Sequence, residues 1–528
     1  MRPHAIGIGR EDCAVDIRLA YCPVITHLLH CSGARRDSAT PAAAGEGAAI
    51  THGLQTRTAC SPGEVASAAV SSLAVTLKRS VMWFRRDLRL LDNPALLEAI
   101  RSGPEGVLPV FVIDPRLWDA AGRPRRAYLT SSLRELSTAL EGALVVLRGD
   151  PLRVLAGVSR AVDAQTVHIA ADFGPYGTIR DASVERRLES LGVELRRTGS
   201  PYAVAPGRVT KQDGAPYQVY TPYYKAWMTH SWPAPAAEPT GLVVLRQTIA
   251  DAIRLETVFD MSSLPAVGEM AAHRRWDEFL ATRLASYSQD RDRPDLPGSS
   301  RMSGALKFGE IHPRTLLDDL GTSKSHDSYR KELAWREFYA DVLYHRPGSA
   351  REYLRVEYSN MRYDTGAVAQ SRLSAWRAGR TGYPIVDAGM RQLLAEGWMH
   401  NRVRMIVASF LVKDLHLEWQ VGARWFMQHL SDGDLASNSH GWQWTAGCGT
   451  DAAPYYRIFN PLTQGLRFDP EGDYVRRHVP ELRHLSGPIA HEPWKASDGY
   501  EHAYPQRVVD HAQERKEALA RYQAIKAG

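Results

Sequence analysis

The chain has 528 residues, of which 44% are hydrophobic and 23% are charged, which is typical of a globular protein with two or three domains. No uninterrupted apolar run approaches the roughly 20 residues that a membrane span needs. Its five cysteines are too few for a disulfide scaffold and form no CxxC pair, so we expect a cytoplasmic protein without a metal site. The formal net charge of +6 suits a polyanionic partner without requiring one.

Residues 1–74 contain no motif and are rich in small residues, as in SATPAAAGEGAAITHG at 38–53. A basic stretch followed by an apolar core is absent, which argues against a secretory signal. Two explanations are open, a disordered extension or an overlong reading frame that truly starts at Val75. We therefore expect the folded protein to begin near residue 75.

Residues 75–205 alternate between short apolar runs and helical patterns. The helix predicted at 90–100 begins with Pro94 after an N-cap at Asp92 or Asn93. This alternation predicts an α/β domain with a doubly wound parallel sheet. The predicted strands lie within 80–84, 106–113, 143–150 and 166–172, and two further helices within 126–140 and 181–191.

Charged and aromatic residues follow the predicted strands. Open α/β sheets bind ligands beyond the carboxyl ends of their strands, although such residues also serve as ordinary caps and turns. From the residues themselves both interpretations are open. The residues concerned are Arg85, Arg86, Asp87, Asp114, Asp172 and the turn FGPYG at 173–177.

The second half of the chain is predicted to be helical. Residues 206–275 have the composition of an interdomain linker, notably WPAPAAEPTG at 232–241. From residue 276 to 528 helical patterns dominate, which predicts an all-α domain. Helices are expected within 274–287, 328–345, 387–398 and 399–419, and the last part of the chain reads as a basic amphipathic helix.

The helix predicted at 399–419 carries polar residues on a mostly apolar element. Asn401, Arg404 and Met405 fall at i, i+3 and i+4 and therefore project together. Asp432 and Asp434 follow the helix, and because a buried carboxylate needs a partner, Arg404 is the obvious candidate. A structural ion pair is one explanation and a binding site is the other.

The next segment favours a site, because Asn438, Trp442 and Trp444 make it unusually rich in polar and aromatic groups for a core. On a helix the two tryptophans point about 200° apart, so one can face inward and the other outward.

Several long motifs occur in this region: GRTGYPIVDAGMRQL (379–393), WMHNRVRM (398–405), DGDLASN (432–438), GWQW (441–444), GTDAAPYYRIFNP (449–461) and HEPW (491–494). Together they closely resemble the flavin domain of class I cyclobutane pyrimidine dimer DNA photolyases. Weaker similarity extends back to WFRRDLRLLDNP at 83–94, so the resemblance covers nearly all of residues 78–510.

The resemblance implies that FAD is the cofactor. The run SSRMS is similar to the family's phosphate-binding TSRLS, although in isolation it reads as an N-cap cluster. Asn438 matches the position opposite flavin N5. The residues that the resemblance assigns to FAD are Tyr287, Ser299, Ser300, Arg301, Met302, Ser303, Arg336, Trp398, Arg404, Asp432, Asp434 and Asn438.

Glu332, Trp335 and Arg336 again fall at i, i+3 and i+4, which would equally suit a core tryptophan between surface charges. In the resembled family the matching Glu hydrogen-bonds the base edge of the dimer, the Trp stacks on it and the Arg contacts the flavin. Stacking would offset the cost of flipping the lesion out of the duplex. The lesion-binding residues implied are Glu332, Trp335, Asn401, Met405 and Trp444.

We therefore expect a monomeric lyase that splits cyclobutane pyrimidine dimers in DNA, using an electron from photoexcited, fully reduced FAD. The alternative is a cryptochrome-type photoreceptor without repair activity. Plant cryptochromes carry Asp and insect ones Cys where this chain has Asn438, which favours repair. Asn401 and Met405 replace the His pair of (6-4) photolyases, and His400 belongs to the ordinary WMHN motif. A flavin oxidoreductase would need a GxGxxG motif, which is missing.

Two further expectations come from the resemblance. The FGPYG turn favours 8-hydroxy-5-deazaflavin over methenyltetrahydrofolate as an antenna chromophore. Electrons for flavin photoreduction usually pass along three tryptophans, of which Trp442 and Trp419 match the first two. Gly366, ten residues before Trp376, occupies the third position, and the nearest upstream aromatic is Tyr363, in a stretch expected to be exposed.

Overall fold

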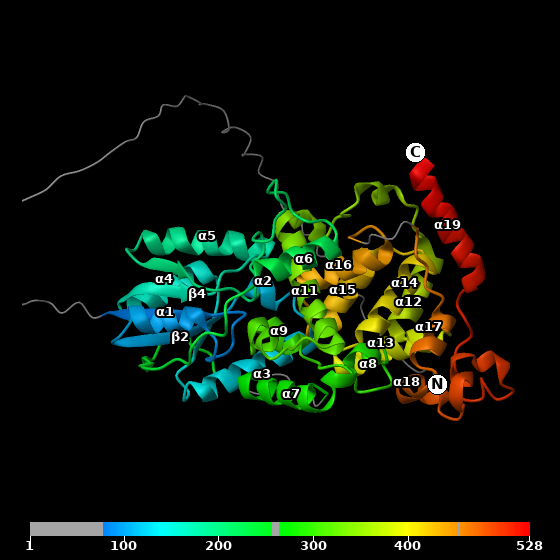
Figure 1. Ribbon diagram of the computed structural model, residues 1–528, viewed down its shortest axis with the longest axis horizontal. Coiled ribbons are helices and arrows are strands. Elements are labelled where there is room, and N and C mark those ends of the chain that lie inside the picture. The colour runs from blue at the N-terminus through cyan, green and yellow to red at the C-terminus, as the bar shows by residue number, and fades with distance from the viewer. Residues whose placement is uncertain (1–77, 256–262, 451–454, 528) are drawn as a thin grey trace, which may run out of the picture. The chain divides into compact units, whose positions relative to one another are not determined.

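The computed structural model describes residues 78–255, 263–450 and 455–527. The predicted extension at 1–74, with four of the five cysteines, lies outside the described residues. From residue 78 onward an α/β part is followed by a helical part (Figure 1). The predicted fold class is confirmed.

The α/β part is built on one parallel sheet with the strand order β3-β2-β1-β4-β5. In this order the winding of the chain changes direction between β1 and β4, where doubly wound sheets hold ligands. The strands are β1 (Arg79–Phe84), β2 (Gly106–Ile113), β3 (Val145–Arg148), β4 (Ala164–Ile169) and β5 (Glu194–Arg197).

Helices cover both faces of the sheet because residues of β1 point alternately to either side. Val81 and Trp83 pack with α4 and α5, whereas Met82 and Phe84 pack with α1 and α3. Asn93 caps α1, accepting from the backbone of Leu96 at 3.2 Å. The helices are α1 (Pro94–Ser102), α2 (Pro115–Trp118), α3 (Arg123–Ala139), α4 (Pro151–Ala161) and α5 (Pro175–Glu189).

Three elements of this part were not predicted, the first being the single-turn helix α2. Strand β5 is a charged edge strand in which only Leu195 is buried, so no apolar run marks it in the sequence. Helix α4 lies between two predicted strands and is capped by Asp150, which accepts from the backbone of Leu152 at 3.1 Å.

The segment predicted as a linker at 206–275 contains helix α6 (Tyr220–His230) and the start of α7 (Glu269–Thr282). Trp227 of α6 is fully buried in the helical part and donates its indole N–H to Glu337 at 2.7 Å. Val244 forms an isolated parallel bridge with Val107 of β2. The segment thus packs along both parts of the chain.

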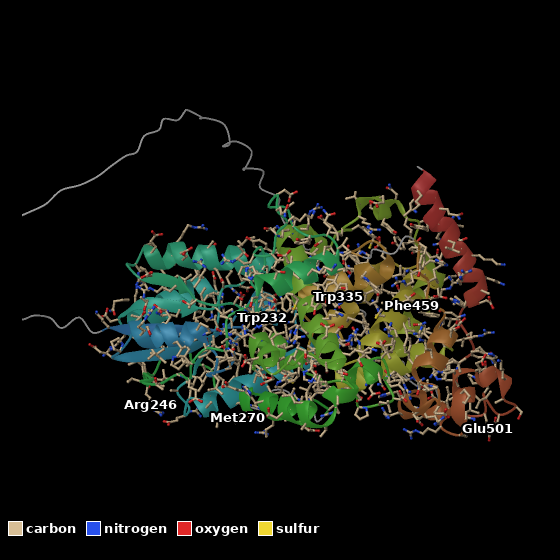
Figure 2. The ribbon with its side chains drawn as sticks, in the orientation of Figure 1. Trp232, Arg246, Met270, Trp335, Phe459 and Glu501 are labelled. Atoms are coloured by element: carbon tan, nitrogen blue, oxygen red, sulfur yellow. The ribbon has the colours of Figure 1, made fainter. Side chains whose placement is uncertain are left out.

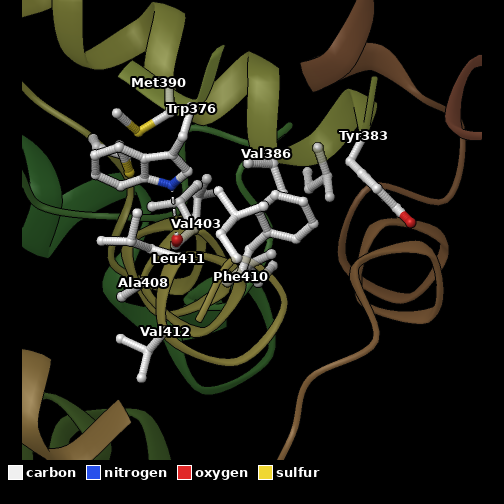
Figure 3. Packing of buried hydrophobic residues seen from close by; sticks show 14 of the residues in the cluster. Trp376, Tyr383, Val386, Met390, Val403, Ala408, Phe410, Leu411 and Val412 are labelled. Atoms are coloured by element: carbon white, nitrogen blue, oxygen red, sulfur yellow. Dashed lines mark hydrogen bonds between the residues drawn. The ribbon is translucent and has the colours of Figure 1, made fainter. Parts of the chain in front are cut away.

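The helical part surrounds a core centred on α14, where Phe410, Leu411 and Val403 lie beneath Trp376 (Figure 3). The Trp376 indole N–H donates to the carbonyl of Val407 at 3.0 Å. The remaining helices are α8 (Tyr287–Asp290), α9 (Ser303–Phe308), α10 (Pro313–Asp318), α11 (Lys324–His345), α12 (Gly366–Ala378), α13 (Pro384–Glu396), α14 (Asn401–Lys413), α15 (Trp419–His429), α16 (Leu435–Ala446), α17 (Pro461–Phe468), α18 (Asp473–His478) and α19 (His511–Ala527).

The prediction of a single helix at 399–419 is wrong. Helix α14 ends at Lys413, His416 takes a left-handed φ of 54°, and Trp419 begins α15. The helical periodicity misled because Leu415 and Leu417 are buried after the turn as well.

None of the helices in the described parts of the chain combines the length and apolar character that a membrane crossing requires. Among the same residues, no group of three His, Cys, Asp or Glu side chains is arranged to hold a metal ion.

Candidate flavin and lesion site

A cavity of about 630 Å³ opens between α9, α11, α14 and α16 in the helical part. Its size is that of a site for a cofactor-sized ligand. Trp335 of α11, one of its wall residues, lies among densely packed side chains in Figure 2. Fifteen of the predicted site residues line it: Tyr287, Ser300, Met302, Ser303, Glu332, Trp335, Arg336, Asn401, Arg404, Met405, Asp432, Asp434, Asn438, Trp442 and Trp444.

The predicted ion pair joins α14 to the turn before α16. Arg404 donates from Nη2 to Asp432 Oδ2 at 2.8 Å and from Nε to the carbonyl of Met399 at 2.8 Å. The second oxygen, Asp432 Oδ1, is buried and has no hydrogen-bond partner among the described residues. Asp432 lines the cavity, and this oxygen is an unpaired acceptor buried within the wall.

Asp434 is paired elsewhere than predicted, because its partners are Arg86 at 3.0 Å and Lys307 at 3.6 Å. It also caps α16 by accepting from the backbone of Ser437 at 3.1 Å. Burial by itself would raise the pKa of Asp434, but Lys307 and Arg86 hold that pKa well below its ordinary value. The carboxylate is thus firmly ionised.

Asn438 and Trp442 project from α16 towards α15. The Asn438 amide donates from Nδ2 to the carbonyl of Ala423 at 3.1 Å, which leaves the amide oxygen as an acceptor. Trp442 packs on Gly422, where an added Cβ would lie 2.1 Å from the indole ring. The glycine therefore lets the two helices approach and fixes Trp442 between them.

The lesion-binding candidates line the same cavity from α11, α14 and α16. The rings of Trp335 and Tyr220 are stacked with centroids 3.6 Å apart, so Tyr220 backs the tryptophan. Glu332 pairs with Arg291 at 2.7 Å. Burial raises the pKa of Glu332, and Arg291 opposes that rise. Trp444 is half-buried and lies under the guanidinium of Arg457, 5.1 Å from its ring centroid.

Asn401 and Met405 sit on one face of α14, as their spacing predicted. Asn401 is exposed at the cavity mouth, and Met405 accepts a long 3.7 Å contact from Arg402 through its sulfur. The arrangement of an open polar end and an apolar wall suits a planar ligand with polar edges.

The predicted phosphate run is divided. Ser300 and Ser303 face the cavity, with Ser300 Oγ 2.8 Å from the hydroxyl of Tyr329. Arg301 instead stacks on Trp398, 4.0 Å from the ring centroid, and pairs with Glu396 at 2.6 Å. Three predicted cofactor residues are therefore absent from the described cavity wall: Ser299, Arg301 and Trp398.

Known proteins share this architecture. Residues 329–524 match the family described as the FAD binding domain of DNA photolyase, and residues 80–240 match DNA photolyase. A deoxyribodipyrimidine photo-lyase of Alkalihalophilus pseudofirmus is 37% identical over 467 residues, 83% of this chain and 96% of the relative.

The chain belongs to the DNA photolyase family. The crystal structure of a bacterial class III photolyase from Agrobacterium tumefaciens superposes with a TM-score of 0.80 at 36% identity, covering 87% of this chain and all of that one. A Synechocystis cryptochrome is more distant, at 27% identity and a TM-score of 0.76, with coverage of 84% and 98%. Family membership and an FAD-binding domain are thus confirmed.

The tryptophans predicted to conduct electrons differ in their neighbours. Trp442 makes an edge contact with Trp376, with centroids 6.2 Å apart. Trp419 is buried at the start of α15, and its ring meets Tyr353 edge-on at 6.3 Å. Gly366 begins α12 in open space, and Tyr363 is half-buried against the core rather than exposed.

At the strand ends of the photolyase sheet, Arg85 binds Asp181 and Arg180 binds Asp172 at 3.1 Å. The turn predicted at 173–177 is only partly correct, because Pro175, Tyr176 and Gly177 form the first turn of α5. Phe173, which precedes it, packs edge-on against Tyr202 and Tyr344. Asp114 caps α2 and accepts from the Tyr176 hydroxyl, and Asp87 accepts from the backbone of Arg85.

Sequence reasoning missed several basic residues of the cavity wall. Lys307 follows Ser303 by four residues on α9, and Arg291 follows Tyr287 by four, so helical spacing from predicted residues could have found both. Arg402 and Arg457 lie inside the quoted motifs without having been assigned a role.

Proposed function

We propose that this chain repairs cyclobutane pyrimidine dimers in DNA in a light-dependent carbon–carbon lyase reaction. The observation that carries the proposal is that the flavin set and the lesion set line one cavity. A lesion on Trp335 and a flavin beside Asn438 would therefore be within reach of each other.

The cavity has the chemistry that FAD requires. Six basic and three acidic side chains line it, an excess of positive charge that suits a pyrophosphate. The Asn438 amide oxygen is left as an acceptor that a polar hydrogen of the cofactor could use. Bound in its reduced form, FAD supplies on photoexcitation the electron that opens the cyclobutane ring, and takes it back afterwards.

The chain's own residues bind and orient the lesion. Trp335, held in place by Tyr220, offers one ring face on which a flipped base can stack. Glu332 is held by Arg291 and can accept from a base edge, while Trp444 forms a second aromatic wall. Arg291, Arg402 and Arg457 place positive charge around the same cavity for the DNA backbone.

A photoreceptor without repair activity is the second candidate, and the similarity to a cryptochrome supports it. The two candidates differ in the lesion set, which a photoreceptor does not need. The test is illumination of the purified, FAD-loaded protein with an oligonucleotide that carries one dimer. Restoration in light and none in darkness is expected, whereas damage that persists in light would favour the photoreceptor.

We further propose 8-hydroxy-5-deazaflavin as antenna chromophore near the carboxyl ends of the strands. The support is the FGPYG turn at the sheet edge where α/β folds hold ligands. Extraction of the second chromophore from the native protein tests this, and methenyltetrahydrofolate would contradict it.

A further inference from the structure

Lys307 is a cation in the cavity wall that the proposed repair reaction does not yet use. It lies one helical turn after Ser303 on α9, and its ammonium is 3.6 Å from Asp434 Oδ2. Arg86 binds the same oxygen at 3.0 Å. Because one carboxylate serves two cations and Arg86 is closer, the charge of Lys307 is only partly compensated.

The other charged groups facing Lys307 come from the α/β part. They are Arg125 of α3, which repels the ammonium, and Asp172 beyond β4, which attracts it. Burial lowers the pKa of Lys307 to about 8, against the opposing effect of Asp434. The protonated form therefore predominates below that pH and is lost above it.

We propose that Lys307 stabilises the negative charge that a flavin in this cavity gains on reduction. The inference rests on the proposed function, since it takes FAD to be the ligand. An oxidised flavin that takes up two electrons and one proton becomes an anion, and a nearby ammonium favours that anion over the neutral oxidised ring. The charge of Lys307 would thus stabilise the reduced cofactor electrostatically.

The competing role for Lys307 is a contact with the pyrophosphate, because Ser303 lies on the same helix face. The pyrophosphate has the same charge in both oxidation states, so losing such a contact would weaken oxidised and reduced FAD equally. Only a charge acting on the ring changes the midpoint potential.

The experiment measures the two-electron midpoint potential of bound FAD in the wild type, Lys307→Met and Lys307→Arg. Lys307→Met should lower the preference of the site for reduced over oxidised FAD about tenfold or more. Each factor of ten lowers the midpoint potential by about 30 mV. Lys307→Arg should stay near the wild type. Lys495→Met, which removes a lysine that is 59% exposed and pairs with Glu492, is the control and should have no effect.

The pH dependence gives a second readout that does not depend on the Met variant folding. In the wild type, reduction should take up one proton below about pH 8. Between that pH and the higher pKa that Lys307 has in the reduced protein it should take up two, because reduction then also protonates Lys307. Lys307→Arg should take up one proton throughout. Arg86→Gln should move the pH at which proton uptake changes from one to two upward. The reason is that Lys307 then no longer shares Asp434 with Arg86, so its pKa rises.

Unchanged potentials in Lys307→Met, with FAD binding weakened equally in both oxidation states, would overturn the inference in favour of the pyrophosphate contact. A single pH slope shared by the wild type and Lys307→Arg would overturn it as well. A wild-type protein that binds no FAD would instead overturn the proposed function and this inference together.

Discussion

An ion-pair network at the carboxyl edge of the sheet and the helical cavity both gather charged side chains, but the charges of the network pair with one another whereas those of the cavity do not balance. At the sheet edge Arg85, Arg180, Asp172 and Asp181 bind one another, and each side chain is at most 16% exposed. In the cavity, basic residues outnumber acidic ones, and Asp432 Oδ1 and the Trp442 indole N–H have no partner among the described residues.

This difference shows that a cluster of polar residues does not by itself mark a ligand-binding site. A closed network stabilises the fold, because each buried charge has its counterpart. Unused hydrogen-bonding capacity together with a surplus of charge points to a ligand. Mutations in the network of Arg85, Arg180, Asp172 and Asp181 should therefore reduce stability, whereas mutations in the cavity should reduce binding of FAD or DNA.

The largest expected effect is on stability, from Arg180→Met. Removing one partner of a buried ion pair costs about 3–5 kcal/mol, because Asp172 and Asp181 lose a shared cation. Denaturant unfolding of the protein measures the loss. The folded variant should still bind one FAD with wild-type affinity.

The matched control is Arg153→Met, since Arg153 is exposed on α4 and should change stability by no more than about 0.5 kcal/mol. Equal stability of the two variants would show that the sheet-edge network is not the closed, stabilising set described above.

Trp335→Ala should act on binding instead. Loss of its stacking face should weaken binding of dimer-containing DNA by about 1–3 kcal/mol, while FAD stays bound. Trp335→Phe keeps an aromatic face next to Tyr220 and should recover most of the affinity. Titration with labelled duplexes measures both variants, and unchanged affinity in Trp335→Ala would remove that residue from the lesion site.

The variants with the smallest expected effect on stability and binding are those that slow photoreduction of the flavin. Repair by the pre-reduced enzyme should be preserved in them. Trp442→Phe and Trp419→Phe should each remove most of the photoreduction rate. Tyr353→Phe should have a smaller effect, because Tyr353 is the ring in contact with Trp419, and Tyr363→Phe a smaller one still. Flavin absorbance under continuous light follows the rates, and normal photoreduction in Trp419→Phe would exclude that residue from the path.

Much of the cavity could be predicted because its motifs resemble those of the photolyase family, and helical spacing then brings the residues of single elements together. Glu332, Trp335 and Arg336 needed only one helix to come together, as did Asn401 and Met405. The parallel sheet was likewise predicted from apolar runs, and its edge strand β5 was missed because it is charged.

The remaining features depend on contacts between distant segments. Arg86 and Asp434 are 348 residues apart in the chain, and nothing local in either motif indicates their pairing. The same holds for Tyr220 behind Trp335, since α6 lies in a segment that reads as a linker. The end of α14 was not visible in the apolar pattern either, because burial continues through the turn that follows it.

The most direct test asks whether flavin and lesion occupy the cavity together. The fluorescence lifetime of reduced FAD in the protein is measured without DNA, with undamaged duplex and with saturating dimer-containing duplex. Electron transfer to a dimer beside the flavin should shorten the lifetime with damaged DNA only, and Trp335→Ala should lessen the shortening. An unchanged lifetime at full occupancy by damaged DNA would contradict a shared cavity.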